Sequence, residues 1–209
     1  LDRLCALFES KKLVHAAIDY IDPVGIERDS VGEGSGLGDE MLHAIANADA
    51  LAAVIRAFED ETGTPCDPVG DFEALSLELT LSDLQKVDNR LERIEGQIQR
   101  VAAEQRNALG AERALLARLK EALEAESPIR SLEFSPDEAR ILRSFQFLTR
   151  KPLLAVVNTG EDADPADVEK LLDTLRKSAT GADGSSWTHF MALCGKTEME
   201  IAQLEEADR

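Results

Sequence analysis

The feature that most constrains the fold is a long segment without proline, which runs from Phe72 to Glu126 and lacks the alternation typical of a strand. Its apolar residues recur at steps of three and four: Leu77, Leu81, Leu84, Val87, Leu91, Ile94, Ile98 and Val101, then, after the stretch "RNALG", Leu115 or Leu116, Leu119 and Leu123. This pattern predicts two antiparallel helices in a coiled-coil hairpin. At ~1.5 Å per residue the first helix would reach roughly 45 Å, which is longer than a core helix needs.

The remaining chain alternates between strand-like and helix-like segments. The strand-like segments are an alternating run over 13–21 and three mainly apolar runs, "ALAAVIRAF" (50–58), "RKPLLAVVN" (150–158) and "SSWTHFMALC" (185–194). Helical patterns cover residues 39–47, 136–145 and 165–179. Strands that alternate with helices indicate a parallel, helix-covered sheet. We therefore expect an α/β domain, made of residues 1–70 and 128–209, with the hairpin of residues 71–127 inserted between its two parts.

Charge and cysteine usage argue against several classes of protein. The net charge of -18 disfavours a chain that wraps nucleic acid, which needs a basic surface, so we see no direct nucleic-acid signal. No apolar run approaches the ~20 residues of a membrane span, and no signal peptide opens the chain. The three cysteines, Cys5, Cys66 and Cys194, form no CxxC pair that would indicate a zinc site or a disulfide framework. We expect a cytoplasmic protein without a membrane partner.

Polar motifs follow three of the predicted strands. A D-x-x-G motif, Asp22 to Gly25, comes after the first strand-like run. In P-loop nucleotidases, an aspartate in this position helps to hold magnesium and the glycine N–H reaches the γ-phosphate. The run ending at Asn158 continues as N-T-G-E, and the last run ends in C-G-K. GTPase domains carry N-K-x-D and S-A-K at the ends of their last two strands, where these motifs contact the base. The order of the motifs thus indicates a nucleotide-binding domain.

A phosphate-cradling loop of the Walker type is missing from this chain. Such a loop reads G-x-x-x-x-G-K-[ST] and lies between the first strand and the first helix. Gly195-Lys196-Thr197 matches the end of that motif, but its first glycine would fall at Phe190, and the segment follows the last strand. We therefore reject it as a phosphate loop.

The chain resembles the YchF-type P-loop nucleotidases, which are relatives of the Obg GTPases in the translation-factor class. The resemblance lies in "RLCALFESKKLVHAAIDYIDPVG", "GEGSGLGDEML", "ADALAAVIRAFED", "DFEALSLELTLSDLQKVDNRLERIE", "FLTRKPLLAVVNTGED" and "EMEIAQLEE". It implies a P-loop nucleotidase sheet with the helical hairpin inserted between the strand ending at Phe58 and the strand ending at Asn158. It also implies binding and hydrolysis of ATP, with GTP as the other candidate, and association with ribosomes. The family's Walker loop would precede Leu1, and a TGS domain would follow this region.

The resemblance also assigns site residues. Asp22 would hold Mg²⁺, which enters with ATP or GTP, and Gly25 would contact the γ-phosphate. The base would be contacted by three residues of the N-x-x-E segment, Asn158, Thr159 and Glu161. A second loop would close over it, formed by Cys194, Gly195 and Lys196.

Two functions remain open at the level of sequence. The first is a YchF-like enzyme that hydrolyses ATP or GTP. The alternative is a catalytically impaired nucleotide-binding or scaffold module whose hairpin binds a protein or ribosomal partner. The family is thought to use a histidine in the loop after "FED", and the corresponding loop here, "FEDETGTPCDPVGD", has none. We therefore assign no catalytic residue, and we expect these 209 residues alone to be inactive.

Overall fold

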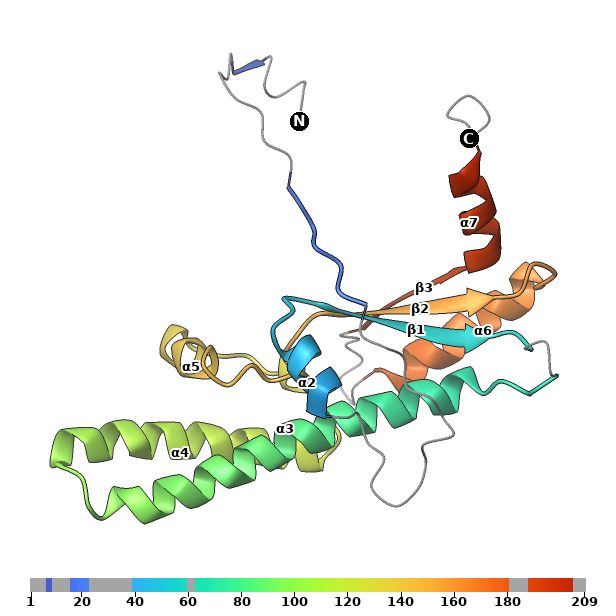
Figure 1. Ribbon diagram of the computed structural model, residues 1–209. Coiled ribbons are helices and arrows are strands. Elements are labelled where there is room, and N and C mark those ends of the chain that lie inside the picture. Colours follow the sequence, from blue (N-terminus) through green and yellow to red (C-terminus); the bar gives the residue numbers. More distant parts are fainter. Residues whose placement is uncertain (1–6, 9–15, 23–38, 60–62, 181–187, 205–209) are drawn as a thin grey trace.

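The computed structural model describes residues 7–8, 16–22, 39–59, 63–180 and 188–204. Figure 1 shows its main elements. In chain order they are α2 (Asp39–Ala46), β1 (Leu51–Ala57), α3 (Pro68–Ile98), α4 (Ala103–Glu124), the 3₁₀ helix η2 (Ile129–Ser131), α5 (Pro136–Leu142), β2 (Leu153–Thr159), α6 (Pro165–Ser178), β3 (Thr188–Leu193) and α7 (Gly195–Gln203). No helix among these residues is long and apolar enough to span a membrane.

The strands form one parallel sheet in the order β1-β2-β3. Leu51 pairs with Leu153, which in turn pairs with Thr188, so the three strands begin side by side. The helix α6 makes the crossover from β2 to β3, as parallel neighbours require. The α/β class and the parallel sheet expected from the sequence are confirmed.

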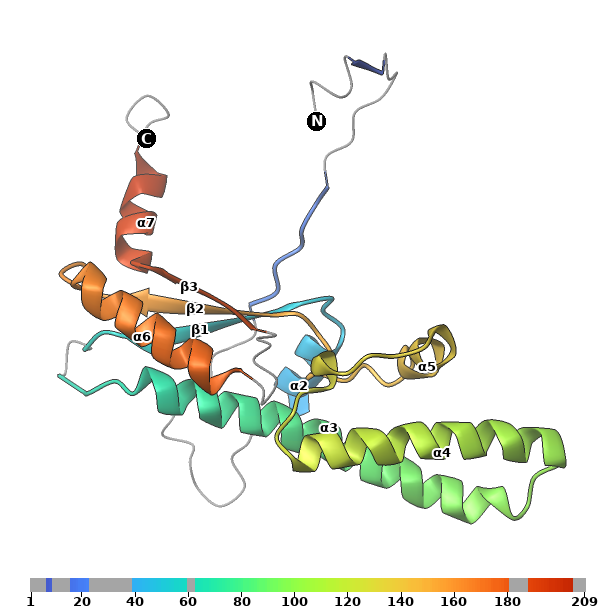
Figure 2. The same ribbon diagram turned by 180° about the vertical axis from the view of Figure 1, so that it is seen from behind.

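One face of the sheet is covered by α3 and α6, which lie below the strands in Figure 1 and again in the reverse view of Figure 2. Side chains of alternate residues on β2 are buried there, among them Leu153, Ala155 and Val157. Phe72 of α3 meets Phe190 of β3 edge to face, with ring centroids 5.1 Å apart. This packing fixes the first part of α3 against the sheet.

The opposite face carries apolar side chains that remain accessible. Val54 of β1 is 71% exposed and Met191 of β3 is 42% exposed. Within the described ranges, α7 continues from β3 and buries none of its residues. The described helices therefore cover the sheet on one side.

The helices α3 and α4 run antiparallel and extend away from the sheet (Figure 1). Asp67 caps α3 by accepting a hydrogen bond from the Gly70 N–H at 3.0 Å, and Pro68 occupies the first helical turn. The seam between the two helices contains Leu84, Val87, Leu91, Ile94, Leu115, Leu116, Leu119 and Leu123. Across this seam Arg90 forms a bidentate ion pair with Glu112. Its Nε lies 2.7 Å from Oε1 and its Nη2 lies 2.8 Å from Oε2.

Two residues of the predicted seam lie outside it. Leu77 and Leu81 are 48% and 53% exposed, whereas Leu79 and Asp83 are buried. The reason is that the first half of α3 packs on the sheet and α2, and only its second half packs on α4. The sheet and α2 bury one face of α3 in its first half, and α4 buries another face in its second half. A single heptad register therefore does not describe both halves. The division of the chain at residues 71 and 127 stays a prediction.

The strand predicted over 13–21 is wrong for the part that the structure describes. Residues 16–22 adopt no regular secondary structure, and Ile18, Tyr20 and Ile21 are exposed. A strand needs a neighbour that supplies its hydrogen bonds, and none of the described strands pairs with this segment. Alternation of apolar side chains alone does not provide that neighbour. Residues 13–15 lie outside the described ranges.

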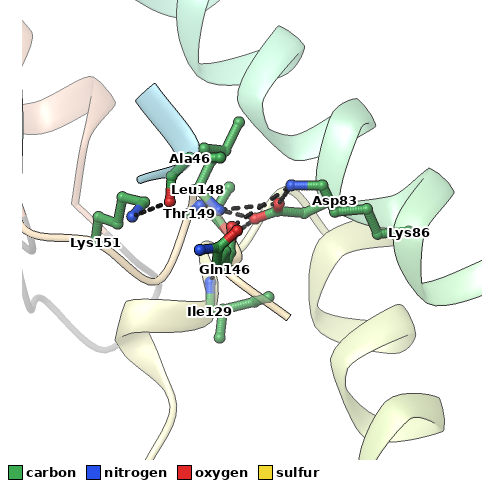
Figure 3. Close-up of polar contacts among 8 residues, drawn as sticks. All are labelled: Ala46, Asp83, Lys86, Ile129, Gln146, Leu148, Thr149 and Lys151. Carbon is green, nitrogen blue, oxygen red and sulfur yellow. Dashed lines mark hydrogen bonds and ion pairs between the residues drawn. The ribbon is translucent and has the colours of Figure 1, made fainter. Parts of the chain in front are cut away.

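A buried carboxylate joins α3 to the segment that leads into β2 (Figure 3). Asp83 is fully buried and accepts hydrogen bonds from the Leu148 N–H at 2.9 Å, the Thr149 N–H at 2.7 Å and the Thr149 hydroxyl at 2.8 Å. Burial raises the pKa of Asp83, while these hydrogen bonds and the Lys86 ammonium, 3.6 Å away, oppose that shift. The carboxylate thus satisfies two backbone donors that would otherwise be buried without partners.

Two basic side chains hold the other side of the same segment. Arg130, in the 3₁₀ helix η2, donates to the carbonyl oxygens of Thr149 and Lys151 at 3.0 and 3.2 Å. Burial lowers the pKa of Arg130 to about 10, and the Asp83 charge opposes this shift. Lys151 donates to the carbonyl oxygens of Ala46 and Ala48, at the end of α2. Residues 146–151 are therefore fixed to α2, α3 and η2 at once.

Replacing Asp83 by alanine should destabilise the protein strongly. Two buried N–H groups and one hydroxyl would lose their acceptor, and we expect the free energy of unfolding to fall by about 3 kcal/mol. The matched control is Asp88→Ala on the same helix, because Asp88 is half exposed and its ion pair with Lys120 should contribute at most about 1 kcal/mol. Urea unfolding of both variants measures the difference. Equal losses in the two variants would contradict the anchoring role of Asp83.

Candidate functional site

The candidate site lies at the carboxyl ends of β2 and β3. In open α/β sheets, ligands bind outside this edge, where loops from neighbouring strands meet. Asn158 pairs with Leu193 in the sheet register, so the segments after β2 and β3 start next to each other. The hydroxyl of Thr159 also donates to the Leu193 carbonyl at 3.3 Å. The structure thus brings together the two predicted base-contacting segments.

Asn158 holds the start of α7 against the end of β2. Its side-chain oxygen Oδ1 accepts a hydrogen bond from the Gly195 N–H at 2.8 Å. A Cβ atom on Gly195 would lie 3.1 Å from that oxygen, so glycine permits this close approach. No described residue accepts a hydrogen bond from the Asn158 NH₂ group. This side chain can therefore position the loop with its oxygen and offer its nitrogen to a ligand.

Glu161 and Lys196 form an ion pair between the same two segments. The Lys196 ammonium lies 2.5 Å from Oε2 of Glu161. The hydrogen bond that Lys196 donates to the Glu161 carboxylate raises the pKa of Lys196, so Lys196 is charged at neutral pH. Both side chains are accessible, at 60% for Lys196 and 44% for Glu161. An exposed pair of this kind adds little stability, so its position at the strand ends is its more informative property.

Cys194 occupies the N-cap position of α7. The polar hydroxyl and backbone N–H groups of Thr197 next to it lower the pKa of its thiol. The Lys196 N–H contributes in the same direction, and the Glu161 charge opposes it. The polar surroundings of Cys194 thus favour its thiolate more than those of an ordinary cysteine. Thr197, which sequence reasoning treated only as part of a rejected motif, is the main cause of this shift.

Of the two residues predicted for the phosphate side of the site, Asp22 lies within the described ranges. Asp22 is exposed and lies in a segment without regular secondary structure. Gly25 falls outside the described residues. Within the described ranges, no cluster of three or more His, Cys, Asp or Glu side chains could hold a metal ion. Protein-bound magnesium commonly takes one or two carboxylates together with phosphate oxygens and water, and a single accessible carboxylate such as Asp22 fits that mode.

Arg56 is an organising residue that the sequence analysis did not single out. It pairs with Asn158 in the sheet register, near the same edge. Its guanidinium donates to the carbonyl oxygens of Phe58 at 3.1 Å, Thr64 at 3.2 Å and Pro65 at 3.3 Å, which holds the segment after β1 near the strand end. The signal in the sequence is an arginine within an otherwise apolar strand.

Comparison with known proteins identifies the relatives of this chain. No family model matches it. The ribosome-binding ATPase YchF of Bacillus subtilis (strain 168) is 34% identical over 215 residues, which cover the whole of this chain and 56% of that protein. Obg-like ATPase 1 of Oryza sativa subsp. indica is 34% identical over 164 residues, covering 77% of this chain and 41% of that protein.

A solved structure supports the same relationship. The Schizosaccharomyces pombe YchF GTPase matches with a TM-score of 0.70 and 25% identity, over 86% of this chain and 49% of that one. The chain therefore spans about half the length of the relatives it matches. In fold and in sequence, it is a protein chain of the YchF type.

Proposed function

We propose that the chain is the base-contacting part of a YchF-like protein that binds ATP, or GTP, with Mg²⁺ and hydrolyses it. The observation that carries the proposal is the Asn158–Gly195 hydrogen bond at 2.8 Å. It joins two motifs, 37 residues apart, that the sequence analysis assigned to one base site. The names of the relatives, a ribosome-binding ATPase, an Obg-like ATPase and a YchF GTPase, support the same function.

Within this proposal the roles of the site residues divide between the two segments. Asn158, Thr159 and Glu161 contact the base from the end of β2, and Cys194, Gly195 and Lys196 close over it from the start of α7. Asp22 would contribute to the magnesium ion and Gly25 to the γ-phosphate, as the resemblance implies. Magnesium, when bound, neutralises phosphate charge and orients the phosphates.

Asn158→Ala should weaken nucleotide binding at least about ten-fold, because it removes both the contact to Gly195 and a donor to the base. Isothermal titration of the full-length protein with Mg-ATP and Mg-GTP measures this. Asn107→Ala is the control, since Asn107 is an exposed residue of α4 with no part in the site. Binding of neither nucleotide by the unsubstituted protein would overturn the proposed function, and equal affinities of the two variants would overturn the role of Asn158.

A turnover assay separates the enzyme from a scaffold that only binds nucleotide. Phosphate release that disappears in Asp22→Ala, with folding retained, supports hydrolysis through the assigned magnesium carboxylate. Binding without any release of phosphate supports the impaired module instead. Residues 58–71 contain no histidine, and this is the sequence feature that favours the second outcome.

A specific observation favours a ribosomal role for the helical pair. Residues 86–120 contain eight Lys and Arg but five Asp and Glu, a net charge of +3 in a chain of -18. Near the turn between α3 and α4, Arg93, Arg100 and Arg106 are exposed, and none forms an ion pair with a described carboxylate. We propose that this distal part of the helical pair contacts ribosomal RNA phosphates, so that the acidity of the whole chain conceals a local basic surface.

Reversing two of these charges, Arg100→Glu together with Arg106→Glu, should reduce co-sedimentation with purified ribosomes several-fold. The loss should be larger at low ionic strength, because phosphate contacts are screened by salt. The matched control also reverses two charges, Arg140→Glu together with Arg143→Glu, since both are exposed arginines in or directly after α5. If the double variant and the control sediment with ribosomes to the same extent, the helical pair does not bind through these arginines.

A further inference from the structure

The two side chains at the strand ends present a defined pattern of hydrogen-bonding groups. The Lys196 ammonium donates a hydrogen bond to Oε2 of Glu161, with an N–O distance of 2.5 Å. The second carboxylate oxygen, Oε1, has no hydrogen-bond donor among the described residues. The pair therefore offers one cationic donor and one carboxylate oxygen, rather than a free carboxylate with two equivalent oxygens.

Adenine and guanine differ in what they need from such a pair. Guanine places two donors side by side, N1–H and the 2-amino group, which match both oxygens of one carboxylate. Adenine places one donor, the 6-amino group, beside one acceptor, N1. A carboxylate whose second oxygen is held by an ammonium can satisfy adenine with its remaining oxygen, but it satisfies only one of the two guanine donors.

We propose that Lys196 sets the choice of base, by occupying one oxygen of Glu161 and thereby favouring adenine over guanine. This inference rests on the proposed nucleotide-binding function. It makes the selectivity of the site a property of the ion pair rather than of Glu161 alone. Removing Lys196 should restore a bidentate acceptor for guanine.

The position of Lys196 follows from its neighbours in the chain. Gly195 is fixed by Asn158 at 2.8 Å, and Lys196 is the next residue, in the first turn of α7. After the contact with Glu161, the nearby groups Glu200 and Cys194 also raise the pKa of Lys196. The helix start thus holds the lysine stem on the side of Glu161. Asn158 determines where the loop lies, and Lys196 determines which oxygen of Glu161 remains open.

The test is the ratio of the affinities for Mg-GTP and Mg-ATP in Lys196→Met, measured by titration on the full-length protein. Methionine keeps an unbranched stem and removes the ammonium. One regained hydrogen bond predicts a rise of about five-fold in the ratio of GTP affinity to ATP affinity. Using the ratio cancels any effect of the lysine charge on the triphosphate, which both nucleotides share. Lys170→Met is the matched control, because Lys170 forms a comparable exposed pair with Asp167 at 2.7 Å on α6.

A second variant tests whether Glu161 is the acceptor involved. In Glu161→Gln combined with Lys196→Met, the amide replaces one carboxylate oxygen by a donor, so the gain for GTP should disappear. An unchanged ratio in Lys196→Met, with both nucleotides bound, overturns this inference and leaves the proposed function intact. The same holds if the gain persists in the double variant. If the unsubstituted protein binds neither nucleotide, the proposed function fails, and this inference fails with it.

Discussion

The structure depends on the buried carboxylate of Asp83, because it fixes the helical pair and the sheet to each other. A helix that packs on the sheet with one half and on another helix with the other half needs a fixed point between the two. Asp83 lies at that point and binds the backbone of Leu148 and Thr149, which are 65 and 66 residues away in the chain. The cost of burying the carboxylate is offset by three donors, and the two backbone groups can find no equivalent acceptor in an apolar core.

The consequence for the site is that β2 starts from a fixed position. The segment 146–151 is held by Asp83, Arg130 and Lys151, and β2 follows directly with both neighbours paired along it. A parallel strand between two neighbours is fixed along its length, since its successive residues form hydrogen bonds alternately with the two neighbouring strands. Asn158, at the far end of β2, is therefore placed by the same contacts that fix the helical pair. The placement of a flexible loop would be less certain.

The sequence predicted the features that follow from local periodicity. The apolar runs of β1, β2 and β3 and the capped starts of α5 and α6 were readable, because buried strands and helix caps leave local patterns. Leu77 and Leu81 were misplaced because the partner of α3 changes along its length. Asp83 gave no signal, since an acidic residue within a helix is exposed far more often than buried. Among the site residues, strand-end position pointed to Asn158 and Gly195, whereas the contact of Lys196 with Glu161 depends on the approach of two segments 35 residues apart.

The two ends of β2 therefore carry contacts of different kinds. Near its start, the buried carboxylate of Asp83 accepts three short hydrogen bonds. Each of these neutral donors would cost about 1–3 kcal/mol if it were buried without an acceptor. At the end of β2, an accessible ion pair adds little stability. That difference suits a site in which the buried contacts fix the scaffold and the exposed pair presents hydrogen-bonding groups to a ligand. A link between partner binding at the helical pair and base binding would in addition require an element with two arrangements. The contacts of Asp83 define a single arrangement, so they position the site, and selectivity is left to the exposed pair at the other end of the strand.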